Sequence, residues 1–370
     1  MRSTLYIHIP FCHSKCAYCD FFSVGRSRLS DDFVDALCAE LRFRRDPSSP
    51  HTIYIGGGTP SSLSDDQLSR IISAIGCRDD VAEFTLEVNP EDVTPARAAH
   101  WRDMGIDRIS MGFQSFDDEM LHFLGRRHNA ADSIEAFDTL RRCGFTNISC
   151  DLIYALPGQS LDQWQESLDK LIALRPEHIS AYALGIEPGT RLYAMLQSGK
   201  IKETDPLLVE QMYDYLTRAT RHAGYEHYEI SNFALPHRRA IHNSCYWDMT
   251  PYLGIGPGAS GFDGITRYHN RPDIKQYIAG SGISSRIDEP ETVDEQYNDM
   301  VMTALRTSAG LPLAEVSRRF GSAYLDYLTA EASPLLRRGL LQLHNSTLTI
   351  PEDRWLVSND IISTLLVVSC

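Results

Sequence analysis

The chain has 370 residues, of which 43% are hydrophobic and 23% are charged, close to an ordinary globular protein. Its net charge of −14 argues against a nucleic-acid-binding protein, because that affinity comes mostly from lysine and arginine. No apolar run is long enough to cross a membrane, and the start MRSTLYIHIPF lacks the features of a signal peptide. These properties predict a cytoplasmic protein without a transmembrane segment, and they stay compatible with peripheral membrane contact.

The first half of the chain alternates between short β-branched runs and amphipathic segments. The expected strands cover residues 4–9, 52–55, 83–88, 108–111, 147–152 and 178–184. The expected helices cover residues 30–44, 65–75, 95–104, 130–143 and 161–174, with capping or acidic residues at several starts. Six such units are too few for a complete eight-stranded barrel. We therefore predict an α/β fold with an open, partial (β/α)6 barrel whose site lies at the carboxyl ends of the strands.

The pattern changes after residue 190. A helix is expected at 205–222, and a loop-rich stretch with five closely spaced glycines follows between residues 254 and 264. Helices near 295–307, 313–320 and 323–332 precede a hairpin at 340–350, an order that resembles a winged-helix module. We therefore expect a barrel core at 1–190, a barrel extension at 191–290 and a C-terminal winged-helix-like α+β module at 291–370.

Three of the nine cysteines, Cys12, Cys16 and Cys19, fall within eight residues directly after the first expected strand. An odd number of cysteines without an export signal argues against a disulfide scaffold. Iron–sulfur clusters are held by thiolates, and three thiolates on a four-iron cluster would leave one iron free for a chelating ligand. One alternative is a zinc site that recruits His8, His13 or a distant cysteine. Another is three unrelated buried thiols.

Glycine and polar residues follow the other expected strands. GGGTP, from Gly56 to Pro60, would allow close backbone approach to a ligand, although a tight turn also favours glycine. Three further strands are interrupted or ended by the polar residues Glu87, Gln114 and Asp151. Salt bridges to arginines such as Arg108 or Arg126 are the structural alternative. Because these positions would share one edge of the sheet, we favour a common site.

The spacing Cys-x3-Cys-x2-Cys, with Tyr18 before the last cysteine, resembles the signature of radical S-adenosylmethionine (SAM) proteins. In that superfamily the methionyl amino and carboxylate groups chelate the open iron, and one electron from the cluster cleaves SAM to a 5′-deoxyadenosyl radical. The glycine motif resembles the one that meets the SAM amino group. The resemblance implies two cofactors, a [4Fe–4S] cluster and SAM, and an electron donor.

Six motifs narrow the resemblance: YIHIPFC, IGGGTPS, EVNPE, RISMGFQSF, LGRRH and DLIYALPGQ. In this order they are similar to the group that contains oxygen-independent coproporphyrinogen III oxidases and HemW haem chaperones. The likeness is strong over residues 6–159 and weaker in the C-terminal module. It implies that Cys12, Cys16 and Cys19 bind the cluster. It also implies that SAM is contacted by Tyr6, Gly57, Gly58, Thr59, Glu87, Gln114, Arg126 and Asp151.

Two departures separate the branches of this group. The oxidases carry a cysteine two residues after the third cluster ligand, where this chain has Phe21, and a long segment before the motif, where this chain has eleven residues. Conversely, HNSCYW matches the His-Asn-x-x-Tyr-Trp pattern associated with haem binding in the chaperones. That likeness implies haem contacts by His242, Asn243, Tyr246 and Trp247. The imidazole is the candidate axial ligand, with His269 weaker; a surface-loop histidine beside a core tryptophan is the alternative.

These features favour a haem chaperone that binds the cluster, SAM and haem and delivers haem to unidentified acceptor proteins. The first alternative is an oxygen-independent coproporphyrinogen III oxidase, which decarboxylates propionates to vinyl groups by radical chemistry. The second is a radical SAM enzyme that acts on RNA through the winged-helix-like module, which the charge of −14 disfavours. Phe21 and the short segment before Cys12 favour the chaperone.

Overall fold

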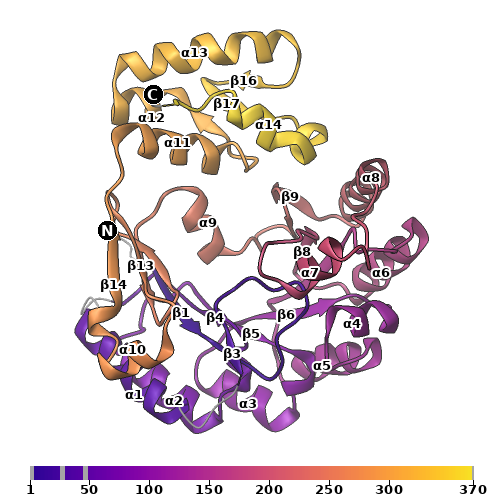
Figure 1. Cartoon of the computed structure of the whole chain (residues 1–370), viewed down its shortest axis with the longest axis vertical. Coiled ribbons are helices and arrows are strands. Elements are labelled where there is room, and N and C mark those ends of the chain that lie inside the picture. The colour runs from indigo at the N-terminus through magenta and orange to yellow at the C-terminus, as the bar shows by residue number, and fades with distance from the viewer. Residues whose placement is uncertain (1–3, 26–29, 45–48, 369–370) are drawn as a thin grey trace.

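The computed structural model describes residues 4–25, 30–44 and 49–368. Within them, six parallel strands form the centre of a twelve-stranded sheet. In spatial order these strands are β1 (Thr4–Ile9), β4 (Thr52–Gly57), β5 (Glu83–Val88), β6 (Arg108–Gln114), β7 (Ile148–Tyr154) and β8 (His178–Ala183). The intervening helices are α1 (Ser30–Arg44), α2 (Asp65–Ile75), α3 (Pro95–Asp103), α4 (Asp118–Leu124), α5 (Ala130–Arg142) and α6 (Leu161–Leu174) (Figure 1). The predicted partial barrel is confirmed.

Both edges of the barrel sheet are extended. At one edge β11 (Tyr252–Ile255) pairs in parallel with β1, and the antiparallel strands β12 (Ser260–Phe262), β13 (Arg267–Asn270) and β14 (Arg286–Glu289) follow. At the other edge the antiparallel strands are β10 (Asn232–Ala234) and β9 (Glu226–Glu229). The helices of this region include α7 (Arg191–Gln197), α8 (Pro206–His222) and α10 (Ile274–Ala279).

The prediction of a loop-rich stretch between residues 254 and 264 is therefore wrong, because this stretch contains the end of β11 and all of β12. Its glycines serve close packing: a Cβ on Gly261 would lie 2.1 Å from the Tyr268 ring, and one on Gly254 would lie 1.8 Å from the Ser260 carbonyl oxygen. Glycine inside a strand weakens the sequence signal for that strand because it offers no side chain to pack. The strands were missed in the prediction because the packing requires glycine at these positions.

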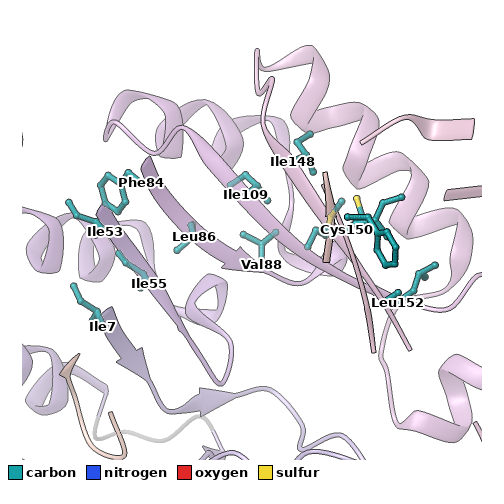
Figure 2. Close-up of a cluster of buried hydrophobic side chains, with 14 of the residues drawn as sticks. Ile7, Ile53, Ile55, Phe84, Leu86, Val88, Ile109, Ile148, Cys150 and Leu152 are labelled. Atoms are coloured by element: carbon teal, nitrogen blue, oxygen red, sulfur yellow. The ribbon is translucent and has the colours of Figure 1, made fainter. Parts of the chain in front are cut away.

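The barrel strands have two chemically different faces. Ile53, Ile55 and Leu86 belong to the continuous apolar core between the strands and the helices, part of which Figure 2 shows. Side chains alternate across a strand, so Tyr54 and Glu87 point to the opposite face, into the barrel lumen. The lumen is therefore lined by polar side chains while the helix-facing layer supplies the apolar burial.

The C-terminal module contains the three predicted helices and the predicted hairpin, together with a short strand after the first helix and a final helix that were not predicted. Its elements are α11 (Val293–Ala304), β15 (Leu311–Pro312), α12 (Leu313–Phe320), α13 (Ser322–Arg337), β16 (Gln342–His344), β17 (Thr347–Thr349) and α14 (Ser358–Ser363). Asn345 and Ser346 turn the predicted hairpin with φ of 49° and 60°, as a tight turn between antiparallel strands requires. Helix α9 (Ile241–Trp247) lies between this module and the barrel and contacts both α11 and β4 (Figure 1). Across the described ranges, no helix has the length and apolar character needed to cross a membrane.

Candidate functional site

A cavity of about 620 Å³ opens at the carboxyl ends of the barrel strands and extends into the lumen. It collects most of the predicted site residues from segments far apart in the sequence. These are Cys12, Cys16, Cys19, Gly57, Gly58, Thr59, Glu87, Gln114, Arg126, Asp151 and Asn243. Four predicted residues, Tyr6, His242, Tyr246 and Trp247, do not line this cavity. The polar strand ends, the cysteines and the glycine motif therefore line one continuous cavity.

Two of the clustered thiols receive hydrogen bonds from polar neighbours. Cys12 ends the short strand β2 (Phe11–Cys12), which pairs with β3 (Val24–Gly25). The Thr59 hydroxyl donates to Cys12 Sγ at 3.6 Å, and Arg126 Nη1 donates to Cys16 Sγ at 3.5 Å. Burial raises the pKa of Cys12. Donors of this kind offset that effect and stabilise sulfur in the thiolate form that binds metal.

The donor set fits a cluster better than a single ion. Among the described residues, no three cysteine, histidine, aspartate or glutamate side chains are close enough to hold one metal ion. A [4Fe–4S] cluster takes each thiolate on a different iron, so its ligands need not converge on one atom. His8 and His13, the candidate zinc ligands, bond instead to the Tyr6 hydroxyl at 3.0 Å and to Asp92 at 3.2 Å. When bound by the three thiolates, such a cluster supplies an electron and a free iron position.

The glycine motif is required by the packing of the loop against the cysteine segment. Gly57 has a φ of +111°, which side chains rarely adopt. A Cβ on Gly58 would lie 2.7 Å from the Phe11 carbonyl oxygen and 3.0 Å from Cys12 Sγ. The two glycines therefore bring the backbone directly against a predicted cluster ligand. The tight turn is present, and it forms one wall of the cavity, where a ligand loop would lie.

Glu87 is hydrogen-bonded, and the salt bridge considered as its structural alternative is not what holds it. Its Oε1 accepts from the Tyr54 hydroxyl at 2.6 Å, and its Oε2 accepts from the Gly57 backbone N–H at 3.0 Å. Burial raises the pKa of this carboxyl to about 7. A ligand ammonium would favour the charged form, so Glu87 is suited to bind a cationic group in the cavity.

Asp151 and Gln114 carry unsatisfied or strained groups at the same cavity. Ser110 donates to Asp151 Oδ2 at 3.4 Å, whereas Oδ1 is buried without a hydrogen-bond partner. Gln114 has a φ of +65° at a register shift between β6 and β7. A left-handed conformation at a residue other than glycine costs free energy and is concentrated at functional sites. Both features fit residues placed for a ligand.

Arg126 joins the polar strand ends to the cysteines. Besides its contact with Cys16, its Nη2 donates to Asn89 Oδ1 at 2.6 Å and to the Gly112 carbonyl at 3.0 Å. Asn89 was not predicted as a site residue. Its sequence signals are its position two residues after Glu87, at the same strand end, and its place in the EVNPE motif.

The HNSCYW segment forms helix α9, so the prediction that it forms a loop is wrong. His242 is 1% exposed and stacks on Tyr54 with ring centroids 5.0 Å apart. Its Nδ1 hydrogen-bonds Thr52 Oγ1 at 2.8 Å, and its Nε2 hydrogen-bonds the Tyr246 hydroxyl at 2.7 Å. Burial lowers its pKa to about 3, so the ring is neutral. The surface-loop alternative is wrong, and in this arrangement neither ring nitrogen is free to coordinate iron.

The other motif residues face two different cavities. Asn243 lines the cavity of the three cysteines. Tyr246 and Trp247 line a second cavity of about 360 Å³ between α9, the barrel extension and α11, where Trp247 Nε1 is buried without a partner. His269 lines neither cavity and bonds Glu289 at 2.9 Å. The motif thus separates two cavities.

Comparison with known proteins decides the family. The radical SAM superfamily matches residues 6–171, and the HemN C-terminal domain matches residues 292–355. The chain is 33% identical to "Heme chaperone HemW" of Bacillus subtilis (strain 168) over 98% of both chains. It is also 33% identical to the protein of that name from Mycobacterium tuberculosis (strain ATCC 25618 / H37Rv), over 98% of this chain and 94% of the relative. The chain belongs to the HemW family.

Membership of the HemW family confirms the resemblance predicted from the motifs. A solved structure of coproporphyrinogen III oxidase (HemN) from Escherichia coli shares the fold with a TM-score of 0.84 and 24% identity, covering 98% of this chain and 90% of that one. The radical SAM match establishes a [4Fe–4S] cluster and SAM as the cofactors of this HemW-family chain. In its cavity, Cys12, Cys16 and Cys19 would hold the cluster, and the polar strand ends would hold SAM.

Proposed function

We propose that this chain is a haem chaperone that binds a [4Fe–4S] cluster, SAM and haem and delivers haem to acceptor proteins in the cytoplasm. The names of its full-length relatives support this function. The structural observation that carries it is the position of Asn243. This residue of the HNSCYW segment lines the same cavity as Cys12, Cys16 and Cys19, although more than two hundred residues separate them.

The rim of the cavity supports a flat apolar ligand. Phe21, which replaces the additional cysteine of the oxidases, is 64% exposed, and Tyr182 is 44% exposed. Aromatic faces left in water are costly, and they stack well on a macrocycle such as haem. These aromatic residues would contact the part of the haem that reaches the opening of the cavity, where an acceptor protein can approach it.

The predicted residues take distinct roles in this proposal. The three cysteines hold the cluster, and the SAM contacts come from the glycine motif, Glu87, Gln114, Arg126 and Asp151. Tyr6 bonds His8, whose ring packs against Gly57 of the glycine motif. His242 positions α9, and Tyr246 and Trp247 anchor it toward the C-terminal module. The chain would consist of a barrel core at 1–190, a barrel extension at 191–290 and a C-terminal module at 291–370. An electron donor would reduce the cluster.

The test is a haem titration of the anaerobically reconstituted protein followed by transfer to an apo-haem protein, with apomyoglobin as the probe. We expect a saturable Soret band at one haem per chain and transfer to apomyoglobin when the holo-protein is mixed with it. Absence of saturable binding would overturn the proposal. In parallel, coproporphyrinogen III is supplied with SAM and a reductant. Protoporphyrinogen formation that depends on Cys16 would replace the chaperone by the oxidase.

A further inference from the structure

Three polar groups that line the main cavity lack hydrogen-bond partners. Arg108 is 1% exposed, and its Nε is buried without a partner, as is Asp151 Oδ1. The side-chain amide of Asn243 forms no hydrogen bond with the described part of the chain. These groups come from β6, β7 and α9 and line the same cavity.

The unused N–H groups of Arg108 have a structural cause. Both oxygens of Glu83, its nearest acid, accept backbone N–H groups at the start of α9: Ile241 N and His242 N, each at 2.9 Å. Arg108 Nε stays 3.8 Å from Glu83, too far for a hydrogen bond, and Nη1 reaches only Thr85 Oγ1 at 3.5 Å. An arginine cannot lose its charge in a protein. The ion pair with Glu83 compensates the charge of this buried guanidinium, but it leaves Nε without a hydrogen-bond acceptor, which a ligand carboxylate would supply.

The position of Arg108 separates this region from the cluster end of the cavity. Arg108 is the first residue of β6, and Gln114 is the last, so the strand spans roughly 20 Å at about 3.3 Å per residue. The cysteines lie with the carboxyl ends of the strands. A group bound by Arg108 therefore lies at the inner end of the cavity, away from the place where a chelating amino acid would meet the cluster.

We propose that Arg108 and Asn243 form a carboxylate subsite at the inner end of the cavity and bind one propionate of haem. The proposal rests on the haem function proposed above. A guanidinium and an amide N–H together present donors matched to the two oxygens of a carboxylate. Burial raises the pKa of the neighbouring Asp151, which reduces the repulsion that the propionate would meet. The HNSCYW asparagine then recognises the acidic edge of haem and not its iron.

The experiment compares haem with its dimethyl ester, in which both propionates are blocked, by Soret titration of the cluster-loaded protein. Arg108→Lys keeps the charge but loses Nε and the forked geometry, and Asn243→Leu keeps the size but loses the amide. Arg127→Gln is the matched control, because it removes an exposed cation from the rim of the same cavity. Cluster absorbance and a thermal melt report whether each variant is folded, and SAM affinity is measured alongside.

We expect wild type to bind haem at least tenfold more tightly than the ester. In Arg108→Lys and Asn243→Leu this ratio should fall to within about threefold, with SAM affinity changed less than twofold, while Arg127→Gln keeps the wild-type ratio. Equal affinity of wild type for haem and ester would overturn the subsite but leave the haem function standing. Loss of the ratio in Arg127→Gln alone would place the propionate at the rim and overturn the subsite. Weakened SAM binding with unchanged haem binding would assign these residues to SAM instead. Failure of wild type to bind either porphyrin would overturn both proposals.

Discussion

Thr52 and His242 are joined by a 2.8 Å hydrogen bond although 190 residues separate them in the chain. Thr52 begins β4 in the barrel, and His242 lies in the first turn of α9. The opposite ring nitrogen of His242 bonds Tyr246, whose ring lines the second cavity. One imidazole therefore fixes the helix that separates the two cavities, and both of its nitrogens are used for that purpose.

Replacing His242 by alanine should destabilise the protein before it affects any ligand. The change removes two hydrogen bonds and the stack on Tyr54, and it leaves Thr52 and Tyr246 without their partner. We expect a loss of about 3 kcal/mol in the free energy of unfolding, measured by urea denaturation of the cluster-free protein. The haem Soret maximum of the folded variant should stay at its wild-type wavelength.

Ser244→Ala is the control for this prediction, because Ser244 lies on the same helix and bonds only the local Ala240 carbonyl at 2.7 Å. It should cost less than about 1 kcal/mol. A His242→Ala protein with unchanged stability and a shifted Soret band would instead identify His242 as an axial ligand, and would require α9 to rearrange when haem binds.

Glu87 should make the SAM-free protein less stable as the pH rises from about 5 to 7. Its pKa is 4.5 in an unfolded chain and about 7 in the fold, because burial disfavours the charged form. A raised carboxyl pKa contributes stability that is complete below pH 4.5 and is lost as the pH rises through 7. The effect is about 3 kcal/mol at most, from 1.36 kcal/mol per pKa unit. Urea denaturation across this range measures it.

Glu87→Gln should remove most of this loss, because its side chain stays neutral at every pH. A smaller slope should persist, since burial also raises the pKa of Glu229 to about 7. The variant should also bind SAM more weakly than wild type at pH 8, where Glu87 would be charged. Identical pH profiles for wild type and variant would mean that Glu87 is solvated in the free protein.

The sequence predicted the barrel well because its strands and helices are long and periodic. Helices α1, α2 and α6 begin and end at the predicted residues, and Ser64 and Thr94 cap α2 and α3 as expected. Short elements whose sequence is fixed by packing were not predicted. Strand β12, with its Gly261, is an example. Periodicity needs more residues than these elements contain.

Within the site, the residue types were predictable but their partners were not. A polar residue at a strand end marks the cavity, so Glu87 was found, but its bond to Tyr54 depends on the pairing of β4 with β5. The burial of His242 follows from tertiary packing alone, because a histidine beside an asparagine gives no local sign of which cavity it faces. Arg108 was considered only as a salt-bridge partner, and its unused Nε is visible only once Glu83 is seen to bond α9.

The three clustered cysteines should each be necessary for the cluster. Changing Cys12, Cys16 or Cys19 to alanine should abolish the broad iron–sulfur absorbance after anaerobic reconstitution. The cluster would have three protein thiolates as ligands, and two would not hold it. Cys77→Ala is the control, since that thiol is exposed and does not line the cavity. Retention of four irons by any of the three variants would contradict this ligand set, and stoichiometric zinc without sulfide would revive the single-ion alternative.

Glu352 should hold the C-terminal module against the barrel in a pH-dependent way. His227 on β9 hydrogen-bonds Glu352 at 3.0 Å, Arg221 at the end of α8 pairs with the same carboxylate, and the Trp355 ring meets the His227 ring edge-on at 4.3 Å. The hydrogen bond from His227 keeps the pKa of Glu352 below its usual value of 4.5. A lowered carboxyl pKa contributes stability that is present above pH 4.5 and is lost as the pH falls further.

Glu352→Gln should therefore lower the free energy of unfolding by about 1 kcal/mol at pH 7, a value reduced by the partial exposure of the pair. The difference from wild type should shrink as the pH falls below 4.5 and the wild-type carboxylate is also protonated. Tryptophan fluorescence during urea denaturation follows the change, because Trp355 lies at this junction. Glu315→Gln is the matched control: it breaks an exposed pair with Arg318 inside α12 and should change stability by less than about 0.5 kcal/mol. Equal effects of the two substitutions would mean that Glu352 acts as an ordinary surface charge. An effect of Glu352→Gln that does not shrink as the pH is lowered would assign its role to packing.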